Sequence, residues 1–292
     1  MTGTATVLVT GATGSTGSAV LEQLLRRDVA VRVMVRRDSD VARFRALGAD
    51  VAVADFDDAS ASAAALAGAR RVYLVTPSSE HAEAQQRRFA ELAVEAGVEH
   101  VVKLSQLGAN ESSPVRFLRW HAAVEGHIRQ LGAGYTFLRP NLFFQGLFAF
   151  APTIARDGRF FAPIGDARVS AVDVRDIAAV AAAALTEPGH EGKTHTITGP
   201  AAITHGEIAM ALSEATGRDI AFVDVPPDAF RASLEDVLPA WQLDGLVEDY
   251  AHYARGEAAD VLPTVAEITE RQPRDIARFA RDYADRFAAE VA

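Results

Sequence analysis

The sequence predicts an α/β protein built on a doubly wound parallel sheet, the Rossmann fold, with a smaller and mostly helical C-terminal lobe. Over the first 140 residues, short apolar runs alternate with segments whose apolar side chains recur at helical spacing. This alternation of strands and helices is typical of a parallel sheet covered by helices on both faces. After Pro140 the regular alternation ends, which marks the start of a different lobe.

The short apolar runs are predicted strands. Each has five or six residues and is rich in Val, Leu or Tyr. Several are apolar at consecutive positions, as in Val7-Leu8-Val9, which is typical of parallel strands that are buried on both faces. The predicted strands cover residues 5–10, 30–35, 50–54, 71–75, 99–104 and 135–139.

The segments between these strands are predicted helices. Two of them carry apolar stripes, formed by Val20, Leu21, Leu24 and Leu25 and by Phe89, Leu92, Ala93 and Ala96. Beyond Pro140 we expect an aromatic-rich helix at 141–155, a turn and short strand at 158–165, a strand then a helix at 169–185, an edge strand at 193–198, and helices from about 204, from about 226, at 241–255 and at 273–287.

The composition excludes several kinds of site and partner. The 292-residue chain has no cysteine, which rules out disulfides, zinc–thiolate sites, iron–sulfur clusters and cysteine nucleophiles. Its eight histidines show no metal-ligand spacing, so we expect no metal site. The formal charge of −10 argues against a nucleic-acid or anionic-membrane partner.

We expect a cytoplasmic protein. The first apolar run leads directly into a glycine loop and leaves no room for a secretory leader. The longest strictly apolar run, 177–185, has nine residues, whereas a membrane helix needs about 20.

A glycine-rich loop joins the first predicted strand to the first predicted helix. Backbone amides at a helix N-terminus carry unpaired donors and a partial positive charge, which suits a pyrophosphate. Glycine permits a tight turn and close approach of the phosphate. The alternative is an ordinary glycine turn, and the spacing is G-x-x-G-x-x-G rather than G-x-G-x-x-G. The predicted dinucleotide contacts are Gly11, Thr13, Gly14, Ser15, Thr16 and Gly17.

The end of the second predicted strand indicates which dinucleotide binds. An NAD site places an acidic residue about 20 residues after the glycines. Here Arg36 stands 19 residues after Gly17. A guanidinium can bind a ribose 2′-phosphate in bidentate fashion, whereas a carboxylate would repel it. We therefore expect NADP(H) to be preferred over NAD(H), with a solvated basic strand end as the alternative.

Asp55 and Phe56 follow the third predicted strand. Asp55 is a candidate acceptor for the adenine amino group, and Phe56 would then lie beside the adenine ring. A plain turn at the strand end is the alternative.

Several of these motifs together resemble a known family. The glycine loop, Arg36, the strand end Val102-Lys103-Leu104-Ser105 and the segment 135–141 are similar to those of the NmrA-like group of atypical short-chain dehydrogenases/reductases. That group includes quinone oxidoreductases, triphenylmethane dye reductases and a redox-sensing regulator. The resemblance covers residues 5–200 well and is looser beyond them. It implies the fold and the nucleotide more specifically than the substrate.

The residues expected at the reaction centre depart from the usual pattern. Typical short-chain dehydrogenases use Ser, Tyr and Lys, with Tyr-x-x-x-Lys on a helix. Here Ser105 is present, but Phe117 and His121 occupy the Tyr and Lys places. Phenylalanine has no proton to give, so the usual tyrosine acid is absent. The resemblance suggests Ser105 as a hydrogen-bond donor near the nicotinamide.

His121 is our candidate for contact with the substrate or the nicotinamide ribose. In isoflavone reductase-like relatives a lysine stands at this place. An ordinary histidine pKa near neutrality would allow general-acid work. The alternative is a histidine that merely pairs with Glu125, one helical turn away.

Residues that follow the strands at their carboxyl ends line the ligand crevice of such a sheet. We expect Thr76, Pro77 and Pro140 beside the cofactor. The candidates for the substrate pocket are Gln106, Leu107, Asn141, Phe143 and Phe144, although the phenylalanines can instead be core. This layout gives a dinucleotide-binding domain at 1–140 plus about 168–200, and a substrate lobe at about 141–167 and 201–292.

The expected function is NAD(P)H-dependent hydride transfer to a small, flat, conjugated acceptor such as a quinone. Loss of the tyrosine acid argues against ordinary carbonyl reduction, because only a conjugated acceptor can spread the negative charge and take its proton later. Two alternatives stay open: a non-catalytic NADP(H)-binding redox sensor, and a tailoring reductase or isomerase of secondary metabolism on the same fold.

Overall fold

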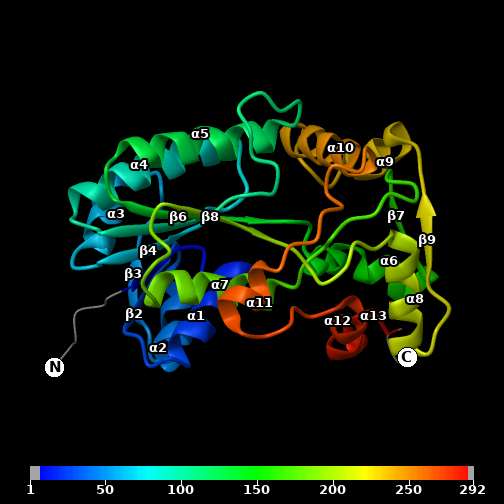
Figure 1. Cartoon of the computed structure of the whole chain (residues 1–292), viewed down its shortest axis with the longest axis horizontal. Coiled ribbons are helices and arrows are strands. Elements are labelled where there is room, and N and C mark those ends of the chain that lie inside the picture. Colours follow the sequence, from blue (N-terminus) through cyan, green and yellow to red (C-terminus); the bar gives the residue numbers. More distant parts are fainter. Residues whose placement is uncertain (1–6, 289–292) are drawn as a thin grey trace. The chain divides into compact units, whose positions relative to one another are not determined.

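The computed structural model describes residues 7–288, so the first two residues of the predicted strand at 5–10 lie outside the described part. The chain forms two compact units. Figure 1 labels their helices and strands. Unit 1 comprises the described residues of Met1–Glu111, Trp120–Arg139 and Val174–His195. Unit 2 comprises the described residues of Ser112–Arg119, Pro140–Asp173 and Thr196–Ala292.

A seven-stranded sheet in the order β3-β2-β1-β4-β5-β6-β8 forms the centre of the Rossmann architecture. Its strands are β1 (Val7–Val9), β2 (Val31–Val35), β3 (Asp50–Val53), β4 (Arg71–Leu74), β5 (His100–Leu104), β6 (Gly134–Pro140) and β8 (Lys193–Ile197). All strand pairs from β3 to β6 are parallel. The predicted doubly wound sheet is therefore confirmed, and β8 takes the predicted edge position.

Helices cover both faces of this sheet within unit 1 (Figure 1). Helices α1 (Ser15–Leu25) and α7 (Val174–Thr186) pack together on one face, and α3 (Ala59–Leu66), α4 (Ala82–Glu95) and most of α5 (Arg116–Gln130) lie on the other. The short helix α2 (Val41–Ala46) follows β2. Helix α1 buries its predicted apolar stripe, because Val20, Leu21 and Leu24 are buried.

The strand order reverses between β1 and β4. From β1 the chain winds outward to β2 and β3, and from β4 it winds the other way to β5 and β6. In open α/β sheets the ligand crevice lies at such a switch point, outside the carboxyl ends of the strands. The topology therefore identifies the loops after β1 and β4 as the place to look for a ligand.

Unit 2 is mostly helical. Strands β7 (Arg159–Ala162) and β9 (Ala221–Asp224) form a small parallel pair. The helical elements are η2 (Phe144–Phe150), a 3₁₀ helix, and α6 (Ala151–Asp157), α8 (His205–Thr216), α9 (Pro227–Leu234), α10 (Ala240–Ala254), α11 (Thr264–Thr269), α12 (Ile276–Asp282) and α13 (Ala284–Phe287). Helix α8 begins as predicted, because the Thr204 hydroxyl and the Glu207 side chain form a capping box.

Four parts of unit 2 differ from the sequence-based prediction. The strand expected at the start of 169–185 does not form, because Val169 and Val172 make only isolated bridges, to Ile203 and Phe143. The single helix expected at 273–287 is two short helices, because Tyr283 adopts a non-helical φ of −124°. The helix expected at 141–155 starts as the 3₁₀ helix η2. Strand β9 was not predicted, since it has only four residues, two of which are exposed.

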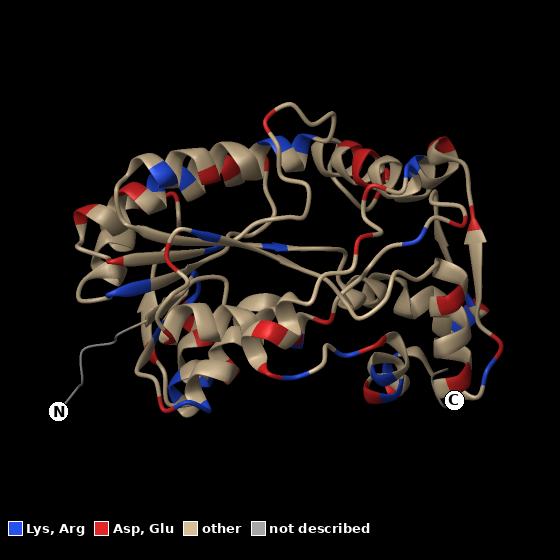
Figure 2. Ribbon diagram, viewed as in Figure 1, with Lys and Arg blue, Asp and Glu red and all other residues tan. Residues whose placement is uncertain are grey.

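No helix within residues 7–288 combines the length and the apolar character needed to cross a bilayer. Acidic and basic residues are interspersed along the helices of both units (Figure 2).

His205 is a buried histidine at the first position of α8. Its ring lies among Phe160, Phe222 and Tyr250, with centroids 5.1–6.4 Å away. Burial lowers the pKa of His205 to about 4. The folded protein therefore holds this ring neutral at pH values where the unfolded chain protonates it.

We predict that the free energy of unfolding decreases as the pH falls from 6.5 towards 4, because the unfolded state binds a proton at His205 that the folded state does not. His205 alone contributes roughly 3 kcal/mol of this decrease, at about 1.4 kcal/mol per pKa unit. Urea denaturation at several pH values measures it. His205→Phe should flatten the dependence by that share, whereas replacing the exposed His81 by Phe should not; equal slopes in all three proteins would contradict the prediction.

Candidate functional site

The loop between β1 and α1 is fastened to the end of β4. The Thr10 hydroxyl donates to the carbonyl oxygens of Tyr73 and Val75 at 3.0 and 2.8 Å, and it accepts from the Val75 amide at 2.9 Å. These bonds hold the carboxyl ends of β1 and β4 together at the switch point of the sheet. The glycine loop therefore starts from a rigid position.

The three glycines of this loop have different structural constraints. Gly11 has a φ of +62°, and a Cβ there would lie 2.6 Å from Cγ1 of Val75. A Cβ on Gly17 would lie 2.2 Å from the carbonyl oxygen of Gly11, so the first turn of α1 packs directly on the loop backbone. A Cβ on Gly14 would lie 3.3 Å from the same oxygen, which is a much smaller conflict. Gly11 and Gly17 are thus required by the loop itself.

Gly14 is the N-cap of α1 and supplies no side chain to satisfy the amides of the first turn. The first turn also contains no acidic residue. Thr13 and Ser15 are exposed beside these amides, whereas Thr16 is buried in the first turn. The N-terminus of α1 therefore keeps the unpaired donors and partial positive charge that suit a phosphate group.

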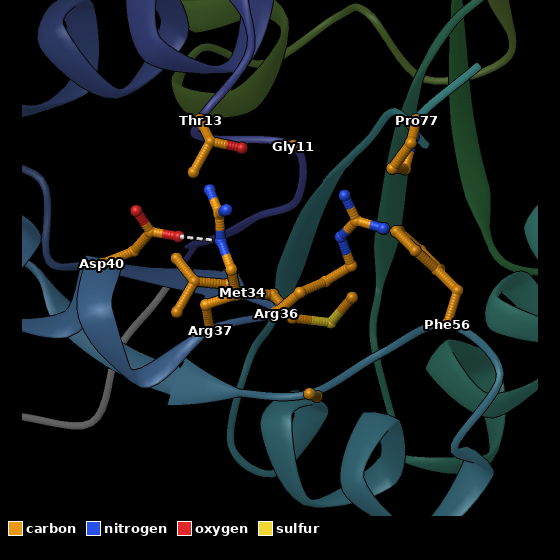
Figure 3. A pocket seen from close by; sticks show the side chains of 10 residues that line it. Gly11, Thr13, Met34, Arg36, Arg37, Asp40, Phe56 and Pro77 are labelled. Atoms are coloured by element: carbon orange, nitrogen blue, oxygen red, sulfur yellow. Dashed lines mark ion pairs between the residues drawn. The ribbon is translucent and has the colours of Figure 1, made fainter.

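A pocket opens at the carboxyl ends of β1, β2, β3 and β4, as Figure 3 shows. The space inside it, including the part open to solvent, is about 430 Å³. Its lining residues are Gly11, Thr13, Met34, Val35, Arg36, Arg37, Asp40, Ala54, Phe56 and Pro77. Five of the predicted cofactor residues, from four different segments, thus line one pocket.

Two guanidinium groups extend into this pocket. The Arg36 side chain points towards Phe56 and Pro77, and that of Arg37 points towards Thr13 (Figure 3). Arg37 pairs with Asp40 at 3.5 Å, but Arg36 has no ion-pair partner within residues 7–288. The structure therefore adds Arg37 and Asp40 to the sequence-based candidates. Arg37 stands beside Arg36 in the sequence, and this doubled basic strand end was the available signal.

Asp55 and Thr76 are engaged in local contacts. The Asp55 carboxylate accepts from the Asp57 amide at 3.0 Å, as in the plain turn that was the alternative expectation. The Thr76 hydroxyl accepts from Nε2 of Gln86 at 2.9 Å. Neither Asp55 nor Thr76 lines the pocket. Phe56, by contrast, lines the pocket while its ring packs edge-on against Phe89.

A buried polar cluster lies where β5 and β6 end. Ser105 is buried, and its hydroxyl donates to Oε1 of Glu125 at 2.6 Å. Glu125 is fully buried on α5 and receives two bonds from the Arg139 guanidinium, at 2.9 and 2.6 Å. The Ser105 hydroxyl is thus held by a carboxylate.

His121 pairs with Lys103 rather than with Glu125. Its Nδ1 lies 2.8 Å from Nζ of Lys103, which also donates to the carbonyl oxygen of Leu104 at 2.8 Å. Burial lowers the pKa of His121 well below its ordinary value, and the charges of Lys103 and Arg139 lower it further. The expectation of an ordinary histidine pKa near neutrality is therefore wrong, because partial burial and the neighbouring charges of Lys103 and Arg139 both disfavour the charged imidazole.

Sequence reasoning missed Lys103 and Arg139 as members of this cluster. Both stood within the motifs that resemble the NmrA-like group, but neither was assigned a role. The available signal for Lys103 was a single lysine within an otherwise apolar predicted strand. Nothing in the sequence indicated that Arg139, rather than His121, would pair with Glu125.

Phe117, at the place of the usual tyrosine, belongs to unit 2. Its ring lies edge-on to Trp241, at a centroid distance of 6.2 Å. A Cβ on Gly245 of α10 would lie 2.2 Å from the Phe117 ring, so the ring fills the space above that glycine. The segment 112–119 is therefore part of unit 2, although the sequence placed it with the dinucleotide-binding domain.

The candidate substrate residues of unit 2 differ in how deeply they are buried. The Asn141 amide donates to Oγ of Ser170 and to the carbonyl oxygen of Ala258, at 2.8 and 2.9 Å, and the residue is buried. Phe144 is buried against Phe279, at a centroid distance of 5.4 Å. These contacts make both residues part of the core of unit 2. Phe143 is only partly buried, and Pro140 is the buried last residue of β6.

The remaining candidates, Gln106 and Leu107, lie half-buried in the turn after β5 in unit 1. Within residues 7–288, no group of three His, Asp or Glu side chains is placed to hold a metal ion.

Two bacterial enzymes are similar to this chain over nearly its whole length. The chain is 36% identical over 285 residues to (4-alkanoyl-5-oxo-2,5-dihydrofuran-3-yl)methyl phosphate reductase of Streptomyces griseus, covering 97% of this chain and 100% of the relative. It is 34% identical over 284 residues to NAD(P)H azoreductase of Xenophilus azovorans, covering 97% and 99%.

Among solved structures, the fold is similar to that of an NADPH-dependent quinone oxidoreductase from Escherichia coli in complex with NADPH. The TM-score is 0.86 at 28% sequence identity, covering 94% of this chain and 99% of that chain. The model of the NmrA-like family matches residues 3–278. The chain therefore belongs to the NmrA-like family, which confirms the resemblance found in its sequence motifs.

Proposed function

We propose that this chain is an NAD(P)H-dependent oxidoreductase that transfers hydride to a flat conjugated acceptor such as a quinone. The observation that carries the proposal is the pocket in which the glycine loop meets the arginines at the end of β2. The relatives support it, because two of them are named as an NAD(P)H azoreductase and an NADPH-dependent quinone oxidoreductase. When bound, the nicotinamide cofactor supplies the hydride.

The pocket fits a dinucleotide. The uncapped amides at the N-terminus of α1 bind the pyrophosphate, and the close packing at Gly11 and Gly17 leaves room for it. Arg36 binds the ribose 2′-phosphate, which makes NADP(H) the preferred cofactor. Arg37, positioned by Asp40, adds positive charge to the same pocket.

Phe56 and Pro77 line the side of the pocket towards which Arg36 points, and we assign them to the adenine ring (Figure 3). Asp55, Thr76 and Pro140 stay predictions as cofactor contacts, because none of them lines this pocket.

The acceptor is expected to be conjugated because no tyrosine acid is present at the place of Phe117. Hydride addition to a quinone leaves a negative charge that spreads over the ring, so this step needs a strong protein acid less than the reduction of a plain ketone does. Gln106 and Leu107, which follow β5, are our candidates for acceptor contacts in unit 1. The name of the Streptomyces relative favours a second candidate, the reduction of an oxo-dihydrofuran that carries a methyl phosphate group.

We predict that the purified protein oxidises NADPH in the presence of a benzoquinone at a rate well above the protein-free background. Loss of NADPH absorbance measures this reaction. A screen of quinones, azo compounds and oxo-dihydrofurans then ranks the acceptors by kcat/KM. Tight NADPH binding without turnover of any acceptor would contradict the reductase and support the redox-sensor hypothesis instead.

Arg36→Ala should weaken NADPH binding by about 1–3 kcal/mol, because a charge-assisted bidentate contact to the 2′-phosphate is lost. NADH binding should change little, since NADH has no phosphate there. Calorimetric titration of both nucleotides measures the difference. Arg43→Ala, on α2 and outside the pocket lining, controls for a general loss of positive charge. Equal losses for both nucleotides would contradict the assignment of Arg36.

Gly14→Val should abolish dinucleotide binding while the protein stays folded, because a side chain at the N-cap of α1 occupies the phosphate space but meets little of the loop itself. Nucleotide titration together with circular dichroism measures both effects. Gly206→Val on α8 is the matched control, with its nearest neighbour 3.6 Å from the added Cβ. Unchanged NADPH affinity in Gly14→Val would show that the loop has a structural role only.

A further inference from the structure

Lys103 is a lysine in the middle of a fully buried strand. All five residues of β5 are buried, and Lys103 itself has no solvent exposure. Burying an ammonium group is costly unless it is paired and hydrogen-bonded. An apolar side chain would fill this position of a central strand without that cost. The position of Lys103 therefore suggests a role beyond packing.

Lys103 pairs with His121, which is less buried than the lysine. Nζ of Lys103 lies 2.8 Å from Nδ1 of His121, which is a half-buried residue. An ammonium group can only donate, so Nδ1 accepts and the single proton of the neutral imidazole is on Nε2. Within residues 7–288, Nε2 has no hydrogen-bond partner. Lys103 thus fixes the tautomer that presents an N–H group to a ligand.

The groups around the pair allow Lys103 to change its charge near neutral pH. Burial lowers the pKa of Lys103 to about 7, while Glu125 of α5 raises it and Arg139 of β6 lowers it again. Glu125 is itself held by Ser105 and Arg139. The pKa of His121 is lowered well below its ordinary value, so its ring is neutral at pH 7 and has no surplus proton of its own.

We propose that Lys103 and His121 form a proton relay to the reduced acceptor. The proposal rests on the proposed function, because it requires an acceptor that becomes negatively charged on reduction. The acceptor gains a hydride from the reduced nicotinamide, so it is reduced by two electrons and the nicotinamide is oxidised. His121 then acts as the catalytic residue that contacts the acceptor, and Lys103 acts through it as a positioning residue.

The relay delivers one proton to the acceptor oxygen and regains one proton from water. The bond between Nε2 of His121 and its proton breaks as that proton joins the acceptor oxygen. Nδ1 takes a proton from Nζ of Lys103, so the imidazole stays neutral with its proton moved to Nδ1. Lys103 becomes a neutral amine that accepts from Nδ1. A proton from water returns along the same route and restores the ammonium group of Lys103.

The relay explains how a neutral histidine can serve as an acid. A neutral imidazole alone gives up a proton reluctantly, but here a second proton replaces the first as it leaves. An acid is most effective when its pKa lies near the working pH, which holds for Lys103. The buried charge is lost rather than created during the transfer, so the apolar surroundings of Lys103 favour it.

The chain has only two lysines, Lys103 and the exposed Lys193, which allows a direct test on the full-length protein. In protein labelled with ¹³C-lysine, the side-chain signal of Lys103 should titrate near pH 7, well below the range of an ordinary lysine. In protein labelled with ¹⁵N-histidine, His121 should be neutral with its proton on Nε2 below pH 7, where Lys103 is an ammonium group. Both readouts are independent of enzymatic activity and of bound cofactor.

A kinetic test separates proton delivery from hydride transfer. For a quinone, kcat/KM should fall as the pH rises above about 7, because the relay needs the protonated form of Lys103. Lys103→Met should lower quinone turnover by about 10²–10⁴-fold and remove this pH dependence, without changing NADPH affinity. Reduction of a cationic triphenylmethane dye should be spared, because hydride alone converts the cation to a neutral product. Lys193→Met is the matched control and should behave like the parent.

The two proposals can fail separately. If no acceptor is reduced, the proposed function fails whatever the spectra show. If Lys103 titrates in the range of an ordinary lysine, or if His121 carries its proton on Nδ1 below pH 7, the relay is overturned even in an active reductase. An equal loss of quinone and dye turnover in Lys103→Met would also overturn it. If Lys103→Met does not fold, the spectra of the parent protein decide.

Discussion

The contact between the first turn of α1 and the carbonyl group of Gly11 determines the geometry of the candidate site. Because a Cβ at Gly17 would lie only 2.2 Å from that oxygen, the helix can approach the loop this closely only with glycine at that position. The Thr10 hydroxyl fastens the same loop to β4. Together these contacts direct the free amides of α1 to the point where the strand order reverses, and the other pocket residues are arranged around that point.

The polar cluster at the ends of β5 and β6 is buried, unlike the open dinucleotide pocket. It buries charge in the sheet and stays stable because the charged groups are paired, as with Glu125 and Arg139. Unit 1 thus contains two sites of different chemistry. The open pocket with Arg36 suits the binding of a charged ligand, whereas the closed cluster with Lys103 suits the movement of a proton.

The prediction from sequence was accurate where local pattern and structure coincide. The consecutive apolar residues of β1 and the glycines after it predicted the sheet and its switch-point loop. The helix start expected at about 204 agrees with α8, because the capping box of Thr204 and Glu207 involves only neighbouring residues. The prediction was less accurate where a side chain is held by distant residues, as for Phe117 above Gly245 or Asn141 beside Ala258.

By itself, the sequence determined the fold class, the family and the position of the dinucleotide loop, because each depends on residue types at short and regular spacing. Only the tertiary structure decided that Arg37 shares the pocket with Arg36, and that His121 pairs with Lys103 and not with Glu125. The physical reason is that partner choice and burial depend on which strands and helices become neighbours. The charge state of His121 depends in turn on those neighbours, so no spacing along the chain could reveal it.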